Sequence, residues 1–146
     1  AFKACKNFSE GDAQHSFICL LGRNYKVKKQ LLEEIIYGLN RRSADSLYVQ
    51  MGQFTEELCQ SILNETTAMF HQKYEQIDVL LFDDVERIDC REATQEEFYY
   101  LLKNRYFSRK ATLLLSPIPS LPFYRFDDFN GKITDLVASW ECFCID

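Results

Sequence analysis

The fold of this chain is decided by the stretch Ile77-Asp78-Val79-Leu80-Leu81-Phe82-Asp83-Asp84-Val85. Within it, the apolar residues Val79–Phe82 run directly into two adjacent carboxylates. A short, unbroken apolar run is typical of a strand that helices cover on both faces, as in a parallel sheet. We therefore expect Asp83 and Asp84 to lie at the carboxyl end of this strand, where open α/β sheets form their ligand crevice.

Adjacent acids at the end of a buried strand have two ordinary explanations. In a Walker B strand they hold a hydrated Mg²⁺ ion and orient an attacking water. In other proteins a strand-end acid caps the backbone of the following turn. The choice between the two depends on whether the rest of a nucleotide site is present elsewhere in the chain.

Composition limits the class of protein. At 146 residues the chain has the size of one domain, and we treat 1–146 as a single unit with an irregular segment at 1–15. A hydrophobic share of 47% is ample for a core and excludes a disordered chain. The net charge of −5 argues against a surface that attracts nucleic acid everywhere, although a local basic patch is compatible with it.

The cysteines and the hydropathy pattern indicate a reduced environment away from membranes. Six cysteines are scattered without a CxxC pair, and the two histidines offer no zinc-ligand spacing. We interpret the cysteines as reduced thiols that act as small core residues, with Cys142 and Cys144 on one face of a strand. No apolar run approaches the ~20 residues of a membrane span. We expect no metal site, no membrane contact and a cytoplasmic location.

Strands and helices are expected to alternate along the chain. Short apolar runs predict strands at 16–21, 46–51, 79–82, 111–116 and 140–145. Helical spacing predicts helices at 26–40, 54–62, 69–74 and 133–139, and a capping box at 94–97 predicts the start of another. This order predicts an α/β three-layer sandwich with a five-stranded, mainly parallel sheet. Pro117, Pro119 and Pro122 predict a rigid loop over the carboxyl edge of that sheet.

The order of these elements resembles the AAA+ core of the bacterial replication initiator family, DnaA, which has a P-loop NTPase fold. The segment Tyr74–Val85 is similar to the family's Y-x-x-x-D-x-L-L-I-D-D-I, and Thr94–Phe98 to its S-Q-E-E-F. Tyr48–Phe54 resembles the family's second strand and the start of the helix after it. The resemblance covers roughly residues 16–146. No part of the chain resembles the family's helical lid, so we expect a core with no lid domain.

The segment that should cradle phosphate departs from the family pattern. The family's G-G-T-G-x-G-K-T-H-L-L falls on Gly22–Leu32, where Gly22 alone survives among the glycines. A phosphate-binding loop needs glycines so that successive N–H groups can surround an anion without Cβ clashes. Lys28 takes the position of the phosphate-binding lysine, but Lys29 replaces the hydroxyl residue that ligates Mg²⁺. We expect the following helix to extend backward through the former loop.

Two further catalytic elements depart from the family. Pro117 replaces the acidic partner of Ser116 in the sensor 1 pair, and the family's S-R-F falls on Ala138-Ser139-Trp140. The missing arginine finger matters because such fingers contribute ~10³–10⁵ in rate. The residues that we interpret as vestigial are Gly22, Lys28 and Lys29 of Walker A, Asp83 and Asp84 of Walker B, and Ser116 of sensor 1.

The aromatic residues of the second half leave two interpretations open. Helical spacing can direct Phe98 inward while Tyr99 or Tyr106 faces outward, and an exposed aromatic patch would mark a partner surface. Core packing explains the same residues without a partner. The segment 121–129 could cover the vacated nucleotide cleft.

Three functions are compatible with these residues. We favour a DnaA-like module that does not hydrolyse ATP, needs no cofactor and acts through a protein partner in DNA replication. The resemblance implies that this partner is a replication initiator or a helicase-loading component. The first alternative is an AAA+ ATPase that binds ATP and Mg²⁺ in a site completed by a partner. The second is a nucleic-acid binder that uses a basic patch beside Tyr25. That patch consists of Arg23, Lys26, Lys28 and Lys29.

Overall fold

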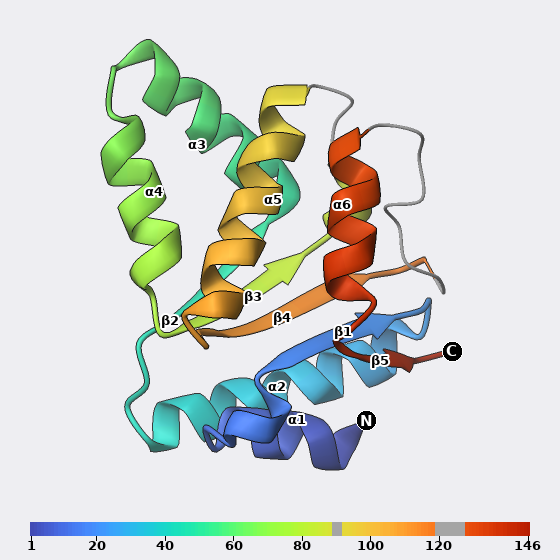
Figure 1. Ribbon diagram of the computed structural model, residues 1–146. Coiled ribbons are helices and arrows are strands. Elements are labelled where there is room, and N and C mark those ends of the chain that lie inside the picture. The colour runs from blue at the N-terminus through green and yellow to red at the C-terminus, as the bar shows by residue number, and fades with distance from the viewer. Residues whose placement is uncertain (89–91, 119–127) are drawn as a thin grey trace.

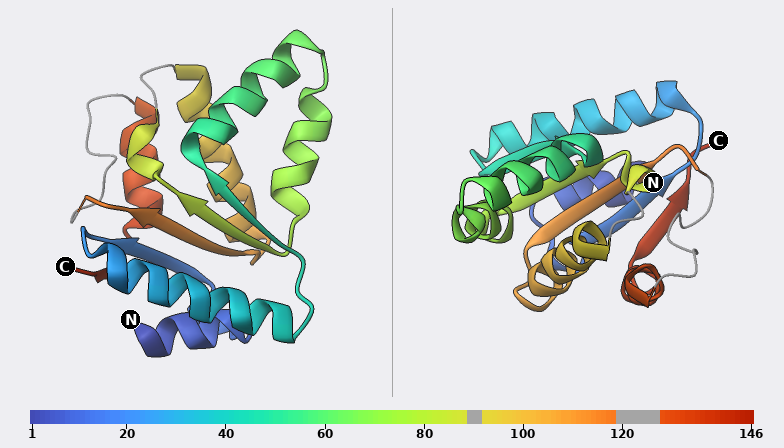
Figure 2. Two further views of the ribbon diagram at one scale, coloured as in Figure 1. Left: turned by 180° about the vertical axis from the view of Figure 1, so that it is seen from behind. Right: turned by 90° about the horizontal axis from the view of Figure 1, so that it is seen from above.

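The computed structural model describes residues 1–88, 92–118 and 128–146. Five strands form one parallel sheet in the order β2-β3-β4-β1-β5. Helices α1 and α2 cover one face and α3 to α6 cover the other, so the domain has three layers (Figure 1, Figure 2). The predicted α/β sandwich with a five-stranded sheet is confirmed, and every strand pairing in it is parallel.

The bounds of the elements follow the expected ranges closely. The strands are β1 (Phe17–Leu21), β2 (Ser46–Gln50), β3 (Val79–Asp83), β4 (Ala111–Ser116) and β5 (Glu141–Cys144). The helices are α1 (Phe2–Ser9), α2 (Tyr25–Arg41), α3 (Met51–Leu63), α4 (Thr67–Gln76), α5 (Glu92–Phe107) and α6 (Asp128–Val137). Two 3-10 turns, η1 (Ala13–His15) and η2 (Val85–Arg87), are also present in the described residues.

The position of each strand in the sheet explains its sequence. Every residue of β3 is buried, because the strand is central and helices cover both of its faces. The outer strands β2 and β5 instead alternate between more and less exposed residues. The unbroken apolar run at Val79–Phe82 therefore identifies the middle of the sheet.

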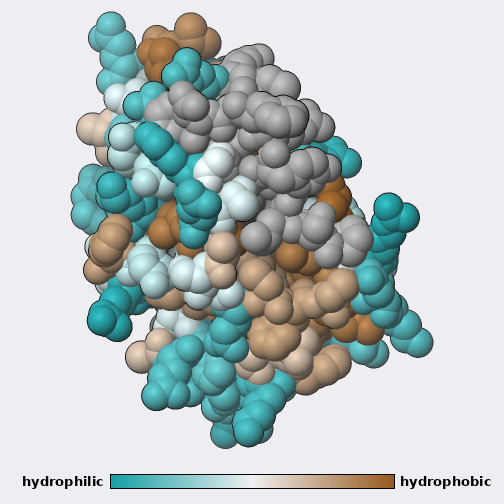
Figure 3. Space-filling model, turned by 45° about the vertical axis from the view of Figure 1, so that its right-hand side comes forward, coloured by the Kyte–Doolittle hydropathy of each residue, from teal (hydrophilic) through white to brown (hydrophobic). Residues whose placement is uncertain are grey.

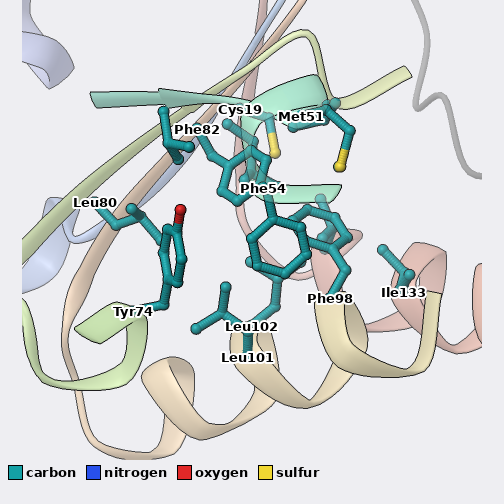
Figure 4. Packing of buried hydrophobic residues seen from close by; sticks show 14 of the residues in the cluster. Cys19, Met51, Phe54, Tyr74, Leu80, Phe82, Phe98, Leu101, Leu102 and Ile133 are labelled. Carbon is teal, nitrogen blue, oxygen red and sulfur yellow. The ribbon is translucent and has the colours of Figure 1, made fainter. Parts of the chain in front are cut away.

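An aromatic cluster fills the layer between the sheet and helices α3, α4 and α5. Phe54 lies at its centre, with ring centroids 5.2 Å from those of Phe82, Phe70 and Tyr74 (Figure 4). Tilted and edge-on pairs of this kind stabilise a core by about 0.5–1.5 kcal/mol each beyond the area that they bury. This layer fixes α3 and α4 against the sheet.

A fully buried arginine ties three elements together at the opposite end of the sheet from the strand-end acids. The guanidinium of Arg105, from α5, donates to the backbone oxygens of Tyr74, Ile77 and Ala111 at 2.9, 2.7 and 2.8 Å. It also donates to Oγ1 of Thr112 at 2.9 Å. Burial lowers the pKa of Arg105 to about 10, so the side chain remains charged at neutral pH.

Two sequence predictions about helix starts are wrong. The segment 1–15, expected to be irregular, contains α1, which buries Ala4, Cys5 and Phe8 at helical spacing. The capping box expected at 94–97 does not open a helix, because α5 already includes Glu92 and places Thr94 in a buried position. In both cases contact with the rest of the fold outweighed the local signal.

The rigid loop predicted from the prolines lies largely outside the described residues, as does most of 121–129.

Among the residues that are described, no helix is long and apolar enough to cross a membrane. The face shown in Figure 3 carries apolar patches between hydrophilic groups, so it is not uniformly charged.

Candidate functional site

The parallel arrangement brings the ends of separate strands to one edge of the sheet. Leu21 at the end of β1 pairs in register with Ser116 at the end of β4. Gln50 at the end of β2 pairs with Asp83 at the end of β3. The predicted site residues Gly22, Asp83 and Ser116 are therefore collected at this carboxyl edge, as the sequence indicated.

Asp83 lies at the centre of this edge and is buried. Its Oδ1 accepts hydrogen bonds from the Lys28 ammonium at 2.9 Å and from the Asp84 amide at 2.8 Å. Its Oδ2 accepts a hydrogen bond from the Tyr48 hydroxyl. Burying a charge is costly unless it is paired and hydrogen-bonded. Both oxygens of this carboxylate are satisfied from within the chain.

Tyr48 is a site residue that the sequence did not reveal. It lies on β2 beside β3, on the same strand face as Gln50, the register partner of Asp83. Burial, together with the hydrogen bond to Asp83 and the charge of that carboxylate, raises the pKa of the Tyr48 phenol. The sequence shows that Tyr48 and Gln50 share one face of a strand. It does not show which strand lies beside β2, so the contact of Tyr48 with Asp83 could not be predicted.

The turn from β1 to α2 is short and its backbone groups are engaged. The Gly22 amide donates to Ser116 O at 3.0 Å, and the Asn24 amide donates to Ile145 O at 2.9 Å. The Asn24 side chain accepts from the Val27 amide at 3.1 Å and caps the helix. α2 consequently begins at Tyr25, which confirms the expected backward extension of the helix.

Gly22 has a structural reason to be glycine. Its φ is +139°, and a Cβ at this position would lie 2.6 Å from the carbonyl oxygen of Ile145. Because such a contact is impossible without a backbone shift, β5 can approach the end of β1 only where no side chain intervenes. The close approach of Ile145 therefore explains why Gly22 is retained, and no bound phosphate is needed for that explanation.

The four cations of the predicted basic patch do not all lie on one exposed surface. Arg23, Lys26 and Lys29 are exposed beside Tyr25, whose residue surface is 73% exposed. Lys28 points instead to Asp83 and is mostly buried. The exposed surface therefore carries three of the four predicted cations.

The remaining predicted residues have local partners. Asp84 adopts a left-handed conformation with φ of 55° and precedes η2. Ser116 Oγ donates to Glu86 Oε2 at 2.8 Å and accepts from the Ile118 amide at 3.2 Å. Ser139, at the finger position, is exposed and donates to Leu136 O at 2.8 Å. Glu86 was not recognised from the sequence, where nothing relates it to Ser116.

No group of three or more metal-ligating side chains occurs in the described part of the chain. That the protein uses neither a metal nor a nucleotide remains a prediction. Asp83 could contact a hydrated ion only if its carboxylate first lost hydrogen bonds to Lys28, Tyr48 or the Asp84 amide.

The sheet order, with a strand-end acid facing a lysine from the first turns of the helix after β1, defines a P-loop NTPase core. The family model "Bacterial DnaA ATPAse domain" matches residues 1–128. The chain belongs to this bacterial DnaA ATPase domain family.

Similar curated proteins are named chromosomal replication initiator protein DnaA. The protein from Nautilia profundicola is 31% identical over 124 residues, which cover 85% of this chain and 28% of the relative. The protein from Lachnoclostridium phytofermentans is 38% identical over 96 residues, covering 63% of this chain and 21% of the relative. The chain thus spans less than a third of the length of these relatives.

Solved structures with the same fold include initiators and helicase loaders. DnaA of Aquifex aeolicus bound to AMPPCP superposes with a TM-score of 0.85 at 21% identity, covering 99% of this chain and 45% of that one. The DnaC helicase loader superposes with a TM-score of 0.75 at 14% identity, covering 99% and 87% of the two chains. At such identities the likeness establishes the fold.

Proposed function

We propose that this chain is a DnaA-family module that does not hydrolyse ATP and acts through protein contacts in the control of DNA replication. Family membership and the names of the curated relatives support the connection with replication. The observation that carries the loss of hydrolysis is the start of α2 at Tyr25, directly after the turn at Gly22–Asn24. A triphosphate needs a loop of free amides at this point.

The contacts of the turn support the same proposal. The amides of Gly22 and Asn24 bind carbonyl oxygens of β4 and of Ile145, and the Val27 amide is capped. A phosphate could use these donors only if the turn detached from the sheet and the helix lost its first turn. Lys28 and Asp83 would also have to separate, leaving a buried carboxylate without its counter-charge.

A surface suited to a protein partner lies on the hairpin formed by α3 and α4. Leu63 and Met69 are 75% and 69% exposed there. Exposed apolar side chains that gather on one surface can mark a site of protein contact. Met69 lines a groove of about 600 Å³, and the residue after Leu63, Asn64, lines it too. The rest of the lining includes Gln53, Glu56, Glu57, Gln60 and Lys73. Lys73 is itself paired with Glu57 at 2.9 Å. This surface favours a partner segment with apolar and basic side chains over a nucleic acid.

The aromatic residues of α5, for which the sequence left a partner surface and core packing both open, are less suitable. Tyr99 and Tyr106 pack partly buried against the core, and Tyr106 stacks on Trp140 with centroids 6.3 Å apart. Their packing supports the core explanation, and the proposed partner surface therefore lies on α3 and α4.

Titration of labelled ATP with Mg²⁺ tests the loss of nucleotide binding. We expect no saturable binding at micromolar nucleotide for the wild type. Lys28→Ala and Lys26→Ala form a matched pair, since Lys26 is exposed on the same helical turn. Micromolar binding that Lys28→Ala abolishes and Lys26→Ala retains would overturn the proposal in favour of the ATPase alternative.

Crosslinking to the purified initiator and helicase-loading proteins of the same organism tests the partner surface. We expect Leu63→Glu and Met69→Glu to reduce the crosslinked yield. Phe107→Glu is the control, because Phe107 is 71% exposed at the end of α5, away from the α3–α4 groove. Equal yields for all three variants would remove the α3–α4 surface from the proposal.

The exposed cations around Tyr25 favour a second candidate, binding of single-stranded nucleic acid. Stacking on an exposed aromatic ring contributes about 1–3 kcal/mol per base, and phosphate contacts make binding dependent on salt. Fluorescence anisotropy with a labelled single strand at low salt tests it. Binding that weakens with salt and with Lys26→Glu and Lys29→Glu supports this candidate, whereas no binding at low salt removes it.

A further inference from the structure

Two cysteines occupy opposing positions on neighbouring strands. Cys19 of β1 and Cys142 of β5 are register partners in the parallel sheet. Neighbouring strands lie about 4.8 Å apart, and disulfides bridge Cα atoms roughly 4.4–6.8 Å apart. The two side chains also project from the same face of the sheet, because opposing residues share their orientation. The positions therefore satisfy the first geometric requirement for a disulfide.

The two thiols differ in access to solvent. Cys19 is buried, whereas Cys142 is exposed on the edge strand. A reagent in solution can reach Cys142 directly, and Cys19 can react only with a group already attached to its neighbour. Cys142 is therefore placed to attack a reagent, and Cys19 is placed to act as the resolving thiol, which displaces the group that Cys142 has bound.

A hydrogen bond between the thiols makes Cys142 the more acidic of the pair. This bond lowers the pKa of Cys142 to about 7 and, together with burial, raises the pKa of Cys19. The protonated Cys142 thiol donates a weak hydrogen bond to the carbonyl oxygen of Trp140 at 3.7 Å, which is lost when the thiol ionises. Thiolates, not thiols, attack disulfides, so Cys142 is the nucleophile of the pair.

Cys144 provides an internal comparison on the same face of the same strand. It is also exposed, but its Sγ lies 3.1 Å from Asp146 Oδ2, and this carboxylate raises its pKa. Two exposed thiols at positions i and i+2 of β5 are therefore expected to differ in reactivity.

We propose that Cys142 is a modification site for small-molecule disulfides of the glutathione type, with Cys19 as its resolving thiol. In the first step the Cys142 thiolate attacks one sulfur of the disulfide, forms a mixed disulfide and releases one thiolate. In the second step Cys19 attacks Cys142 Sγ, the bond between Cys142 Sγ and the small thiol breaks, and the proton of Cys19 leaves with the departing sulfur as the second small thiol. Overall, two protein thiols are oxidised to one disulfide and one small disulfide is reduced to two thiols.

The cross-link would fasten the edge strand β5 to the interior strand β1. It would lie close to Ile145, whose carbonyl oxygen holds the Asn24 amide and whose amide donates to Leu21 O at 2.7 Å. Oxidation would thereby oppose detachment of β5 from the turn before α2. This inference is independent of the proposed function.

Oxidised glutathione and residue-resolved mass spectrometry of the whole chain test the proposal. At neutral pH we expect Cys142 to react roughly tenfold faster than Cys144, because a larger thiolate fraction outweighs the lower nucleophilicity of the more acidic thiol. The Cys142–glutathione adduct should then decay as a peptide linking Cys19 and Cys142 appears. In Cys19→Ala the adduct should form and persist.

Several results would overturn the proposal. One is a reaction at Cys142 no faster than at Cys144 or Cys59, and another is a persistent glutathione adduct in the wild type. A linkage of Cys142 to any cysteine other than Cys19 would have the same consequence. If Cys19→Ala does not fold, the order of adduct and disulfide formation in the wild type decides the question without it.

Discussion

The ammonium of Lys28 lies 2.9 Å from Oδ1 of Asp83, although 55 residues separate them in the sequence. In the family pattern these positions serve a nucleotide, the lysine through its phosphates and the acid through its metal ion. Here the lysine and the acid form an ion pair with each other, and the Tyr48 hydroxyl donates a further hydrogen bond to the carboxylate. The Lys28–Asp83 ion pair is therefore expected to stabilise the fold whether or not a nucleotide is bound.

Removal of one member of the Lys28–Asp83 pair should destabilise the domain. Lys28→Met leaves a buried carboxylate without its counter-charge, and such losses cost up to about 3–5 kcal/mol. Asp83→Asn in the same chain should recover part of the loss, since it removes the unpaired charge. Urea unfolding of the two single variants and the double variant measures the coupling. Lys29→Met, at an exposed position, serves as control and should change stability by less than about 0.5 kcal/mol.

Gly22→Ala and Gly52→Ala should change stability in opposite directions. At Gly22 the added Cβ would meet Ile145 O at 2.6 Å, so we expect a loss of more than about 1 kcal/mol. At Gly52, within α3, the Cβ meets no atom within 4 Å. Alanine there should stabilise the helix by about 0.5–1 kcal/mol. Thermal unfolding distinguishes the two, and equal effects would contradict the packing explanation for Gly22.

Arg105→Met should be among the most damaging single substitutions. It leaves the carbonyl oxygens of Ile77 and Ala111 without their buried donor, and each unsatisfied group costs about 1–3 kcal/mol. Lys110→Met is the comparison, because its ion pair with Asp78 is exposed and should contribute less than about 1 kcal/mol. Similar unfolding free energies for the two variants would show that Arg105 is not a structural centre.

Tyr48 should make the stability of the domain sensitive to alkaline pH. The pKa of its phenol is raised in the fold, so its contribution is complete below the ordinary tyrosine pKa of about 10. Above that pH the unfolded chain releases the proton more readily than the folded one, and the contribution decreases. The difference in unfolding free energy between wild type and Tyr48→Phe should therefore shrink above about pH 10. A difference that stays constant with pH would mean that the hydroxyl does not bind Asp83 as described.

The sequence predicted the sheet well because a strand that is buried on both faces consists of consecutive apolar residues. The run at Val79–Phe82 identified a central strand, and the order of strands and helices predicted a parallel sheet with acids at its carboxyl edge. The bulky residues Tyr25 and Val27 correctly indicated that α2 starts early. Local signals failed where packing dominated, as for α1, which forms because Cys5 and Phe8 are buried.

The sequence by itself determined the family, the α/β sheet and the loss of glycines from the turn before α2, since each depends on residue type and spacing. Only the tertiary structure decided that Lys28 would neutralise Asp83, that Tyr48 would join them and that Cys19 would oppose Cys142. A buried charge or thiol interacts with whatever group lies within a few ångströms. That distance is set by strand order and register, which no single stretch of the chain specifies.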